Sequence, residues 1–133
     1  MRTIKFRGWD EKNAKWAYGS LVTFGKGDYY IYEQDEIPQA LHGAKVDSRS
    51  VGQYTGFRDM NGKEVYEGDI LKARYKCLPL QVVRAEFHEF TGNWVLIDYT
   101  GKTKWSEDLY FGCGNYEVDS SVFLRDVRGV AKK

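Results

Sequence analysis

The histidines and cysteines are the first residues to consider for metal binding. His88-Glu89 has no second histidine at the helical spacing of a zinc-protease motif, and it falls on a stretch that alternates like a strand. His42 stands alone in a loop. Cys77 and Cys113 have no further Cys or His at metal-ligand spacing. These patterns favour structural or solvated side chains, and the sequence predicts neither a metal site nor a cofactor.

An enzyme would also need a nucleophile with its base, or two carboxylates that converge. Asp35-Glu36 and Glu107-Asp108 are adjacent in sequence, so their side chains diverge on a strand and splay on a helix. Gly112-Cys113-Gly114 could expose a thiol, but no base stands near it in sequence. Gly25-Lys26-Gly27 lacks the strand-to-helix setting of a phosphate loop. We therefore expect no enzyme, and an enzyme of unrecognised type is the weakest of three hypotheses.

Four cations are candidates for a nucleic-acid-binding surface. Lys72, Arg74 and Lys76 alternate with apolar residues, so they share one face of a predicted strand. Arg84, on a neighbouring strand, is expected to join them. Small β-barrels bind nucleic acid with exposed aromatic residues and such cations, but Glu86 crosses this face and the formal net charge is only +1. Nucleic-acid binding is therefore the runner-up hypothesis.

A surplus of aromatic residues, 16% of the chain, suggests a different function. Trp9, Trp16, Tyr30 and Tyr32 fall on N-terminal strands that have a thin core of their own. Tyrosine and tryptophan are favoured at protein interfaces because they combine a large apolar ring with a polar group. The leading hypothesis is a protein that acts as a homo-oligomer or by binding a protein partner. Trp9 and Trp16 are its candidate binding residues.

The elements expected to position these residues are nearly all strands. Alternating apolar residues, with Gly and Asn at the turns between them, predict strands at 3–9, 15–22, 29–33, 51–57, 63–66, 70–75, 81–90, 94–99, 116–118 and 121–127. Ser106 followed by two acids predicts a capped helical turn at Ser106–Leu109, and a further turn is expected at 37–42. The sequence thus predicts a β protein with at most one or two short helical turns.

Length and composition limit the class of protein. At 133 residues the chain supports one domain or two small sub-domains, and it can bury a core without disulfide staples. The N-terminus has no apolar signal region, and no window approaches the length of a membrane span. Two cysteines fit reduced thiols. We expect a soluble cytoplasmic protein with no membrane partner.

One stretch carries a recognisable signature. Residues 51–71 read VGQYTGFRDMNGKEVYEGDIL, and residues 5–10 read KFRGWD. The Gln-Tyr-Thr-Gly, Asn-Gly-Lys and Tyr-Glu-Gly-Asp-Ile parts closely resemble the signature of the YopX family, whose members are encoded in phages and prophages. The opening segment also resembles that family, whereas the C-terminal end departs from it. The resemblance implies a phage or prophage accessory protein and brings no catalytic positions to this chain.

The predicted fold is mainly β, with an N-terminal antiparallel β-meander at residues 1–55 packed on a C-terminal SH3-like small barrel at 56–133. Gly68-Asp69 before an apolar pair is typical of the first strand of such barrels. Gly56, Gly62 and Gly68 are expected to shape turns because glycine adopts positive φ without steric cost. We therefore predict that the signature stretch serves the fold and does not hold a reactant.

Overall fold

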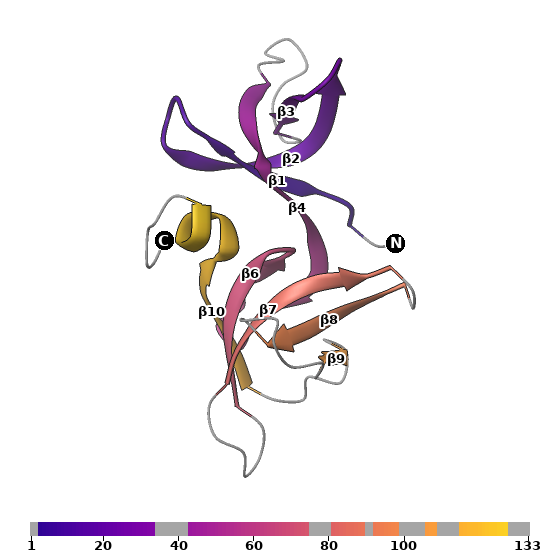
Figure 1. The fold of residues 1–133 in the computed structure, drawn as a ribbon, viewed down its shortest axis with the longest axis vertical. Coiled ribbons are helices and arrows are strands. Elements are labelled where there is room, and N and C mark those ends of the chain that lie inside the picture. Colours follow the sequence, from indigo (N-terminus) through magenta and orange to yellow (C-terminus); the bar gives the residue numbers. More distant parts are fainter. Residues whose placement is uncertain are drawn as a thin grey trace. The chain divides into compact units, whose positions relative to one another are not determined.

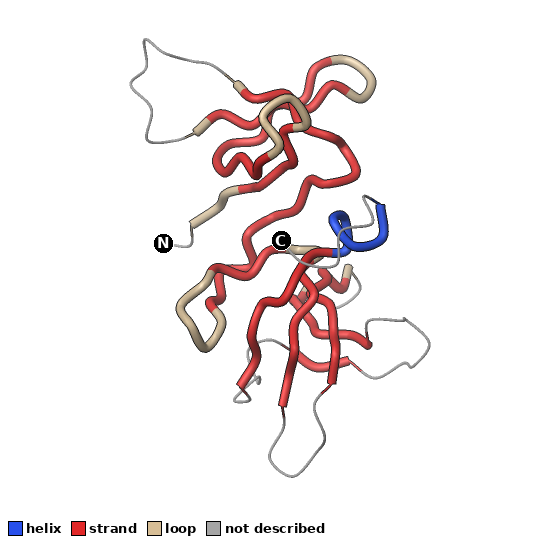
Figure 2. The backbone as a smooth tube through the Cα atoms, turned by 90° about the vertical axis from the view of Figure 1, so that its left-hand side faces the viewer, coloured by secondary structure: helices blue, strands red, loops and turns tan. Residues whose placement is uncertain are grey.

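The computed structural model describes residues 3–33, 43–74, 81–89, 92–98, 106–108 and 115–127. Within these ranges the chain forms ten strands and one short π-helical turn, which Figure 2 shows in red and blue. The mainly β fold expected from the sequence is confirmed. The chain divides into two compact units, Met1–Tyr54 and Thr55–Lys133.

The first unit is a closed ring of four strands. Its strands are β1 (Phe6–Asp10), β2 (Lys15–Phe24), β3 (Asp28–Tyr32) and the first part of β4 (Ala44–Arg58). Neighbours in chain order pair antiparallel, which is the predicted meander, and β1 also pairs with β4. This last pairing joins residues 38 to 47 positions apart, such as Trp9 with Asp47 and Phe6 with Gln53, so no local pattern could indicate it.

The interior of the ring holds the core of the first unit. Ala17, Ile31 and Val46 are buried there, with partly buried apolar side chains packed around them. Gly8 allows β1 to approach β4, because a Cβ at this position would lie 2.6 Å from Cγ2 of Val46. The register between β1 and β4 shifts after Arg7, and this irregularity lets one long strand complete the ring.

The second unit contains the rest of β4 and six further strands. These are β5 (Glu64–Tyr66), β6 (Asp69–Arg74), β7 (Gln81–His88), β8 (Asn93–Asp98), β9 (Ser106–Asp108) and β10 (Asn115–Ser121). Five of them form an antiparallel sheet in the order β10-β6-β7-β8-β9, and β5 pairs with β4 (Figure 1). Leu71, Val83, Ala85 and Leu96 form its core, as the alternation predicted for two of its strands. The SH3-like closure of this sheet stays a prediction.

Two local predictions near the C-terminus are wrong. Ser106–Asp108 forms strand β9 and not a capped helical turn, because these residues pair with β8 from Val95 to Ile97. The predicted strand at 121–127 ends at Ser121 and is followed by a π-helical turn, Phe123–Val127. Oγ of Ser121 accepts a hydrogen bond from the Leu124 N–H at 3.1 Å, which fits a helix start. The turn predicted at 37–42 lies outside the described residues.

Candidate functional site

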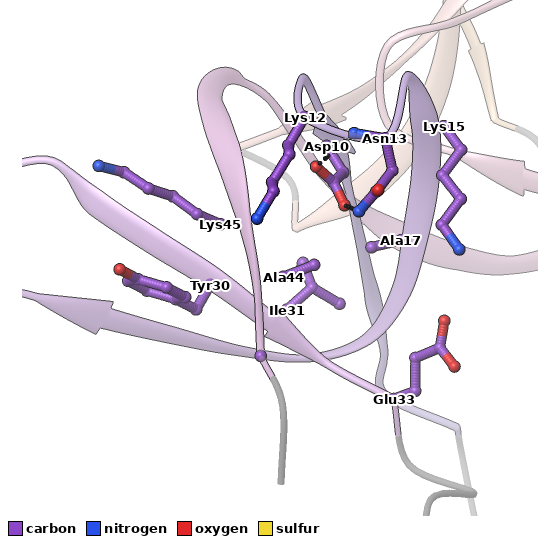
Figure 3. A pocket seen from close by; sticks show the side chains of 11 residues that line it. Asp10, Lys12, Asn13, Lys15, Ala17, Tyr30, Ile31, Glu33, Ala44 and Lys45 are labelled. Atoms are coloured by element: carbon purple, nitrogen blue, oxygen red, sulfur yellow. Dashed lines mark hydrogen bonds between the residues drawn. The ribbon is translucent and has the colours of Figure 1, made fainter. Parts of the chain in front are cut away.

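A pocket of about 480 Å³ lies in the first unit, where the β1–β2 turn, the end of β3 and the start of β4 come together (Figure 3). Its floor is apolar and includes Ala17, Ile31 and Ala44, whereas Lys12 and Lys15 stand on its rim. Ile31 and Ala44 are cross-strand partners, so β3 and β4 together set this floor. The volume lies in the range of small-molecule sites.

The β1–β2 turn is fixed by a carboxylate at its base. Asp10, which is 3% exposed, accepts a hydrogen bond from the side-chain Nδ2 of Asn13 at 2.7 Å and one from its backbone N–H at 3.2 Å. The side-chain hydrogen bond holds the pKa of Asp10 below its ordinary value, although burial acts in the opposite direction. Asp10 is therefore an ionised turn anchor and does not have the raised pKa of a general acid.

Ala14 closes the same turn in a strained conformation. Its φ of +51° lies in the left-handed region, which costs a residue with a Cβ about 1–2 kcal/mol. Glycine or asparagine is the usual residue in such a place. The turn that carries Lys12, Asn13 and Lys15 thus keeps a shape that its sequence does not favour.

The charges around the pocket are only partly balanced. Lys45 lies 3.5 Å from Asp28, and both side chains are more than half exposed, so this pair is weak. Among residues that the structure describes, no ion pair is recorded for Lys12 or Lys15. The charge of Lys15 nevertheless helps to lower the pKa of Asp10, so this lysine is electrostatically coupled to a carboxylate of the pocket.

The two tryptophans predicted as binding residues stack inside the first unit. Trp9 and Trp16 are cross-strand partners whose ring centroids lie 5.3 Å apart at an interplanar angle of 82°. Cζ of Arg7, a residue that is 2% exposed, lies 4.2 Å from the centroid of Trp16. Edge-to-face and cation–π contacts of this kind stabilise the folded chain. Both rings are only half-buried, yet their main contacts are intramolecular.

Exposed aromatic side chains lie on the outer side of β2 and β3 instead. Phe24 is 49% exposed, and its ring contacts Tyr30 at a centroid distance of 5.4 Å. Val22 faces Tyr30 across the strands, and Tyr18 is 40% exposed at an alternate position of β2. We call these four residues, Tyr18, Val22, Phe24 and Tyr30, the outer aromatic face.

Two of the four cations predicted to share a face, Lys72 and Arg84, can be placed in the second unit. Lys72 on β6 pairs with Val82 on β7, and Arg84 on β7 pairs with Ile70 on β6. Cross-strand partners and alternate residues point to the same side, so Lys72 and Arg84 share a face, as the sequence predicted.

Each of these two cations has an acidic neighbour. Nζ of Lys72 lies 3.8 Å from Asp119, and Nε of Arg84 lies 2.9 Å from Glu86. Arg74 is the last residue of β6, but its side chain and all of Lys76 lie outside what the structure describes. The described part of this face is therefore close to neutral.

Asp59, which is 7% exposed, fixes the polar turn within the signature stretch. Its Oδ1 accepts hydrogen bonds from the backbone N–H of Asn61 at 2.8 Å and of Lys63 at 2.9 Å. Gly62, at φ +81°, completes this turn, as the Asn-Gly pair predicted. One carboxylate thus fixes the whole loop between β4 and β5.

The same turn covers the free edge of β10. Oδ2 of Asp59 accepts from the Val118 N–H at 2.9 Å, and the Met60 N–H donates to the Tyr116 carbonyl at 3.0 Å. An uncovered strand edge would offer these groups to another chain. Burial raises the pKa of the Tyr116 phenol, and the charge of Asp59 raises it further. The loop is therefore a structural cover of this strand edge.

The end of the signature is equally structural. Asp69 is fully buried, and its Oδ2 accepts a hydrogen bond from the Tyr66 N–H at 2.8 Å. Gly68, at φ +89°, donates its N–H to the Ala85 carbonyl and accepts from the Val122 N–H. The prediction that these glycines shape the backbone is confirmed.

A model of the protein family described as YopX protein matches residues 5–118. The chain belongs to the YopX family. A search of curated proteins found no match. Membership confirms the resemblance of the signature stretch, whose hydrogen bonds show why these residue types are needed together. It does not assign an activity.

Sequence reasoning missed the pocket of this YopX-family chain. Its residues come from three separated segments, and no regular spacing links Lys12, Ile31 and Lys45. The polar turn with two lysines was the one local signal. Within the described residues, no group of His, Cys, Asp and Glu could hold a metal ion, and no helix there has the length and apolar character to cross a membrane.

Proposed function

We propose that this YopX-family protein acts without catalysis, by self-association through the outer aromatic face. The observation that supports it most directly is Phe24, which is 49% exposed at the end of β2 although it belongs to an aromatic pair. Exposed aromatic side chains that neighbour one another mark interaction surfaces more often than scattered apolar residues do. The role fits a phage or prophage accessory protein, which the family resemblance supports.

The chemistry of the face suits contact with a second copy. Burying apolar surface contributes roughly 25 cal/mol per Å², and Phe and Tyr side chains supply large areas at little cost in conformational entropy. A two-fold arrangement would place Phe24 of each copy near the same face of the other. The formal net charge of +1 means that two copies repel each other little.

This proposal gives the tryptophans a different role from the predicted one. Trp9, Trp16 and Arg7 form an internal stack that stiffens the β1–β2 hairpin. The contact surface is then the opposite end of β2, where Phe24 lies. We place this activity in the cytoplasm, since a chain with two cysteines lacks the cysteine density of small secreted domains.

Nucleic-acid binding has weaker support. Arg84 and Lys72 each have an acidic neighbour, and Glu117 on β10 faces Lys72 across the strands. Affinity for nucleic acid depends on cations that are available to phosphates. Retention of single-stranded DNA that falls steeply with salt, and is lost in Lys72→Glu with Arg74→Glu, would favour this alternative.

Light scattering coupled to size-exclusion chromatography tests self-association. The wild-type chain is expected to form a dimer, and Phe24→Ser is expected to raise the dissociation constant at least about tenfold. Phe87→Ser is the matched control: Phe87 is 42% exposed and also pairs edge-on with one aromatic ring, that of Trp94, but it lies in the second unit.

Two outcomes would contradict self-association. The first is a wild-type chain that stays monomeric at every concentration. The second is an equal loss of dimer in Phe87→Ser, which would show that the outer aromatic face is not special. A monomer that instead captures another protein through Phe24 would support the protein-partner form of the hypothesis.

A further inference from the structure

The pocket beside the β1–β2 turn presents two lysines, of which Lys15 also acts electrostatically on Asp10. Lys12 and Lys15 come from one turn, and Figure 3 shows their side chains on either side of the Asp10–Asn13 pair. Within residues 3–33 and the other described ranges, the structure records no ion pair for either lysine. By contrast, Arg49 forms a 2.7 Å ion pair with Asp47 elsewhere in the same unit.

The floor of the pocket is apolar and rigid. Ala17 is 2% exposed and Ile31 is 1% exposed, and both belong to the core of the ring. The small side chains of Ala17 and Ala44 leave space above this core. The accessible apolar surface comes from the half-buried Tyr30 and Ala44, and a bare inorganic anion would leave it uncovered, so the preferred ligand has an apolar body as well as negative charge.

The sum of the charges around the pocket is positive but modest. Lys12, Lys15 and Lys45 are opposed by the carboxylates of Asp10 and Glu33, which leaves a net +1 for the lining residues, and Lys45 also pairs weakly with Asp28 beside the pocket. Asp10 is bound on both oxygens by Asn13. Figure 3 shows Glu33 on the wall across from the turn, where its charge would disfavour an anion. A ligand must therefore carry enough negative charge to gain more from the lysines than it loses to Glu33.

The backbone of the turn carries strain at the same place. Ala14, at φ +51°, lies between Asn13 and Lys15. Strained residues are often found where a binding or catalytic geometry is held in advance of the ligand. Here the strained conformation sets the directions in which the two lysines leave the turn.

We propose that this pocket binds a phosphate monoester with a compact apolar body. A phosphate dianion interacts about twice as strongly with an ammonium group as a carboxylate does at equal distance. Its three terminal oxygens can accept hydrogen bonds from several lysines together. The apolar body covers Tyr30 and Ala44, above the buried side chains of Ala17 and Ile31. Tyr30 belongs both to this site and to the outer aromatic face, but Lys12 and Lys15 belong only to the pocket and Phe24 only to the face, so variants at these residues test the two proposals separately.

An NMR titration of the full chain with phenyl phosphate tests the site. Saturable chemical-shift changes are expected for the amides of Ala17, Ile31 and Ala44. Inorganic phosphate, which lacks the apolar ring, and phenol, which lacks the charged group, should each bind at least about tenfold more weakly. The double variant Lys12→Gln with Lys15→Gln is expected to weaken phenyl phosphate binding at least about tenfold. Lys26→Gln, on the β2–β3 turn of the same unit, is the control and should stay within about twofold.

The variant Glu33→Gln is expected to strengthen phenyl phosphate binding, in contrast to the lysine variants. Removing its charge is expected to tighten binding about threefold, and a misfolded variant could not show this gain. The proposal is overturned if phenyl phosphate gives no saturable shifts, if inorganic phosphate binds as tightly, or if Lys26→Gln weakens binding as much as the double variant. Weaker binding by Glu33→Gln would overturn it as well.

Discussion

The two units of this chain use similar strands in opposite ways. In the first unit, β1 to β4 close into a ring, yet the unit keeps a strained turn, an exposed aromatic face and two lysines for which no ion pair is recorded among the described residues. In the second unit, the signature stretch covers the edge of β10 through Asp59, and the described cations on β6 and β7 have acidic neighbours. Most of the signature stretch, from Thr55 onward, therefore builds the second unit, whereas the features that suggest binding lie in the first.

Removing Asp59 should have the largest effect, and it tests whether the signature is structural. Asp59→Ala leaves three backbone N–H donors without their acceptor, and that of Val118 is buried. We expect a loss of about 3–4 kcal/mol in the free energy of unfolding, measured by urea denaturation, with fast amide exchange at Val118.

Asp47→Ala is the control for Asp59→Ala. Asp47 also accepts several hydrogen bonds, but its partner Arg49 is exposed, so a loss below about 1 kcal/mol is expected. If both variants lost the same free energy, the special role of Asp59 in covering β10 would be refuted.

Trp16→Ala should have the next largest effect, and it separates internal from exposed aromatic residues. The change removes the edge-on contact with Trp9 and leaves the buried guanidinium of Arg7 without its stacking ring. We expect a loss of about 2–3 kcal/mol, measured by thermal and urea unfolding. Phe24→Ala, on the outer aromatic face, should cost under about 1 kcal/mol in the monomer. The reverse order would show that Phe24 is an internal packing residue and that Trp16 is not.

Much of the fold could be predicted from local patterns, because alternation reports which strand face is buried. Alternation predicted the strand at 81–90, whose Val83 and Ala85 lie in one core. The Asn61-Gly62 pair predicted a turn, where Gly62 has a positive φ. Prediction from local patterns failed where pairing partners decide the structure: Ser106–Asp108 has the residues of a helix start but is drawn into a strand by β8.

The candidate site could not be predicted in the same way. Closure of the ring depends on pairing of β1 with β4, and the pocket exists only once the β1–β2 turn, β3 and β4 are brought together. The prediction that Lys72 and Arg84 lie on the same side of the sheet is confirmed. The ion pair of Lys72 with Asp119 could not be predicted from the sequence, because Asp119 belongs to β10, far along the chain.

Acid should weaken the first unit through its turn anchor. The folded pKa of Asp10 lies below its ordinary value of 3.8, so the stabilisation is fully present above that value and is lost as the pH falls through the folded pKa. Asp10→Asn should lower the free energy of unfolding by about 1 kcal/mol near neutral pH. The difference in unfolding free energy between this variant and the wild type should narrow below pH 3.8. Intrinsic fluorescence during urea unfolding at several pH values measures it. A gap that stays constant down to pH 2 would contradict an ionised anchor.

The smallest effect concerns the strain at Ala14, and here the expected sign is stabilising. Glycine removes the steric cost of a Cβ at φ +51°, about 1–2 kcal/mol. Glycine also gives the unfolded chain more conformational entropy, which offsets about 0.4–1 kcal/mol of this gain. Ala14→Gly should therefore gain about 0.5 kcal/mol in unfolding free energy, while phenyl phosphate binding weakens because Lys12 and Lys15 are held less firmly. Ala17→Gly, in the core of the ring, should only destabilise. If Ala14→Gly stabilised the chain and left binding unchanged, the strain would be a property of the turn alone and not of the pocket.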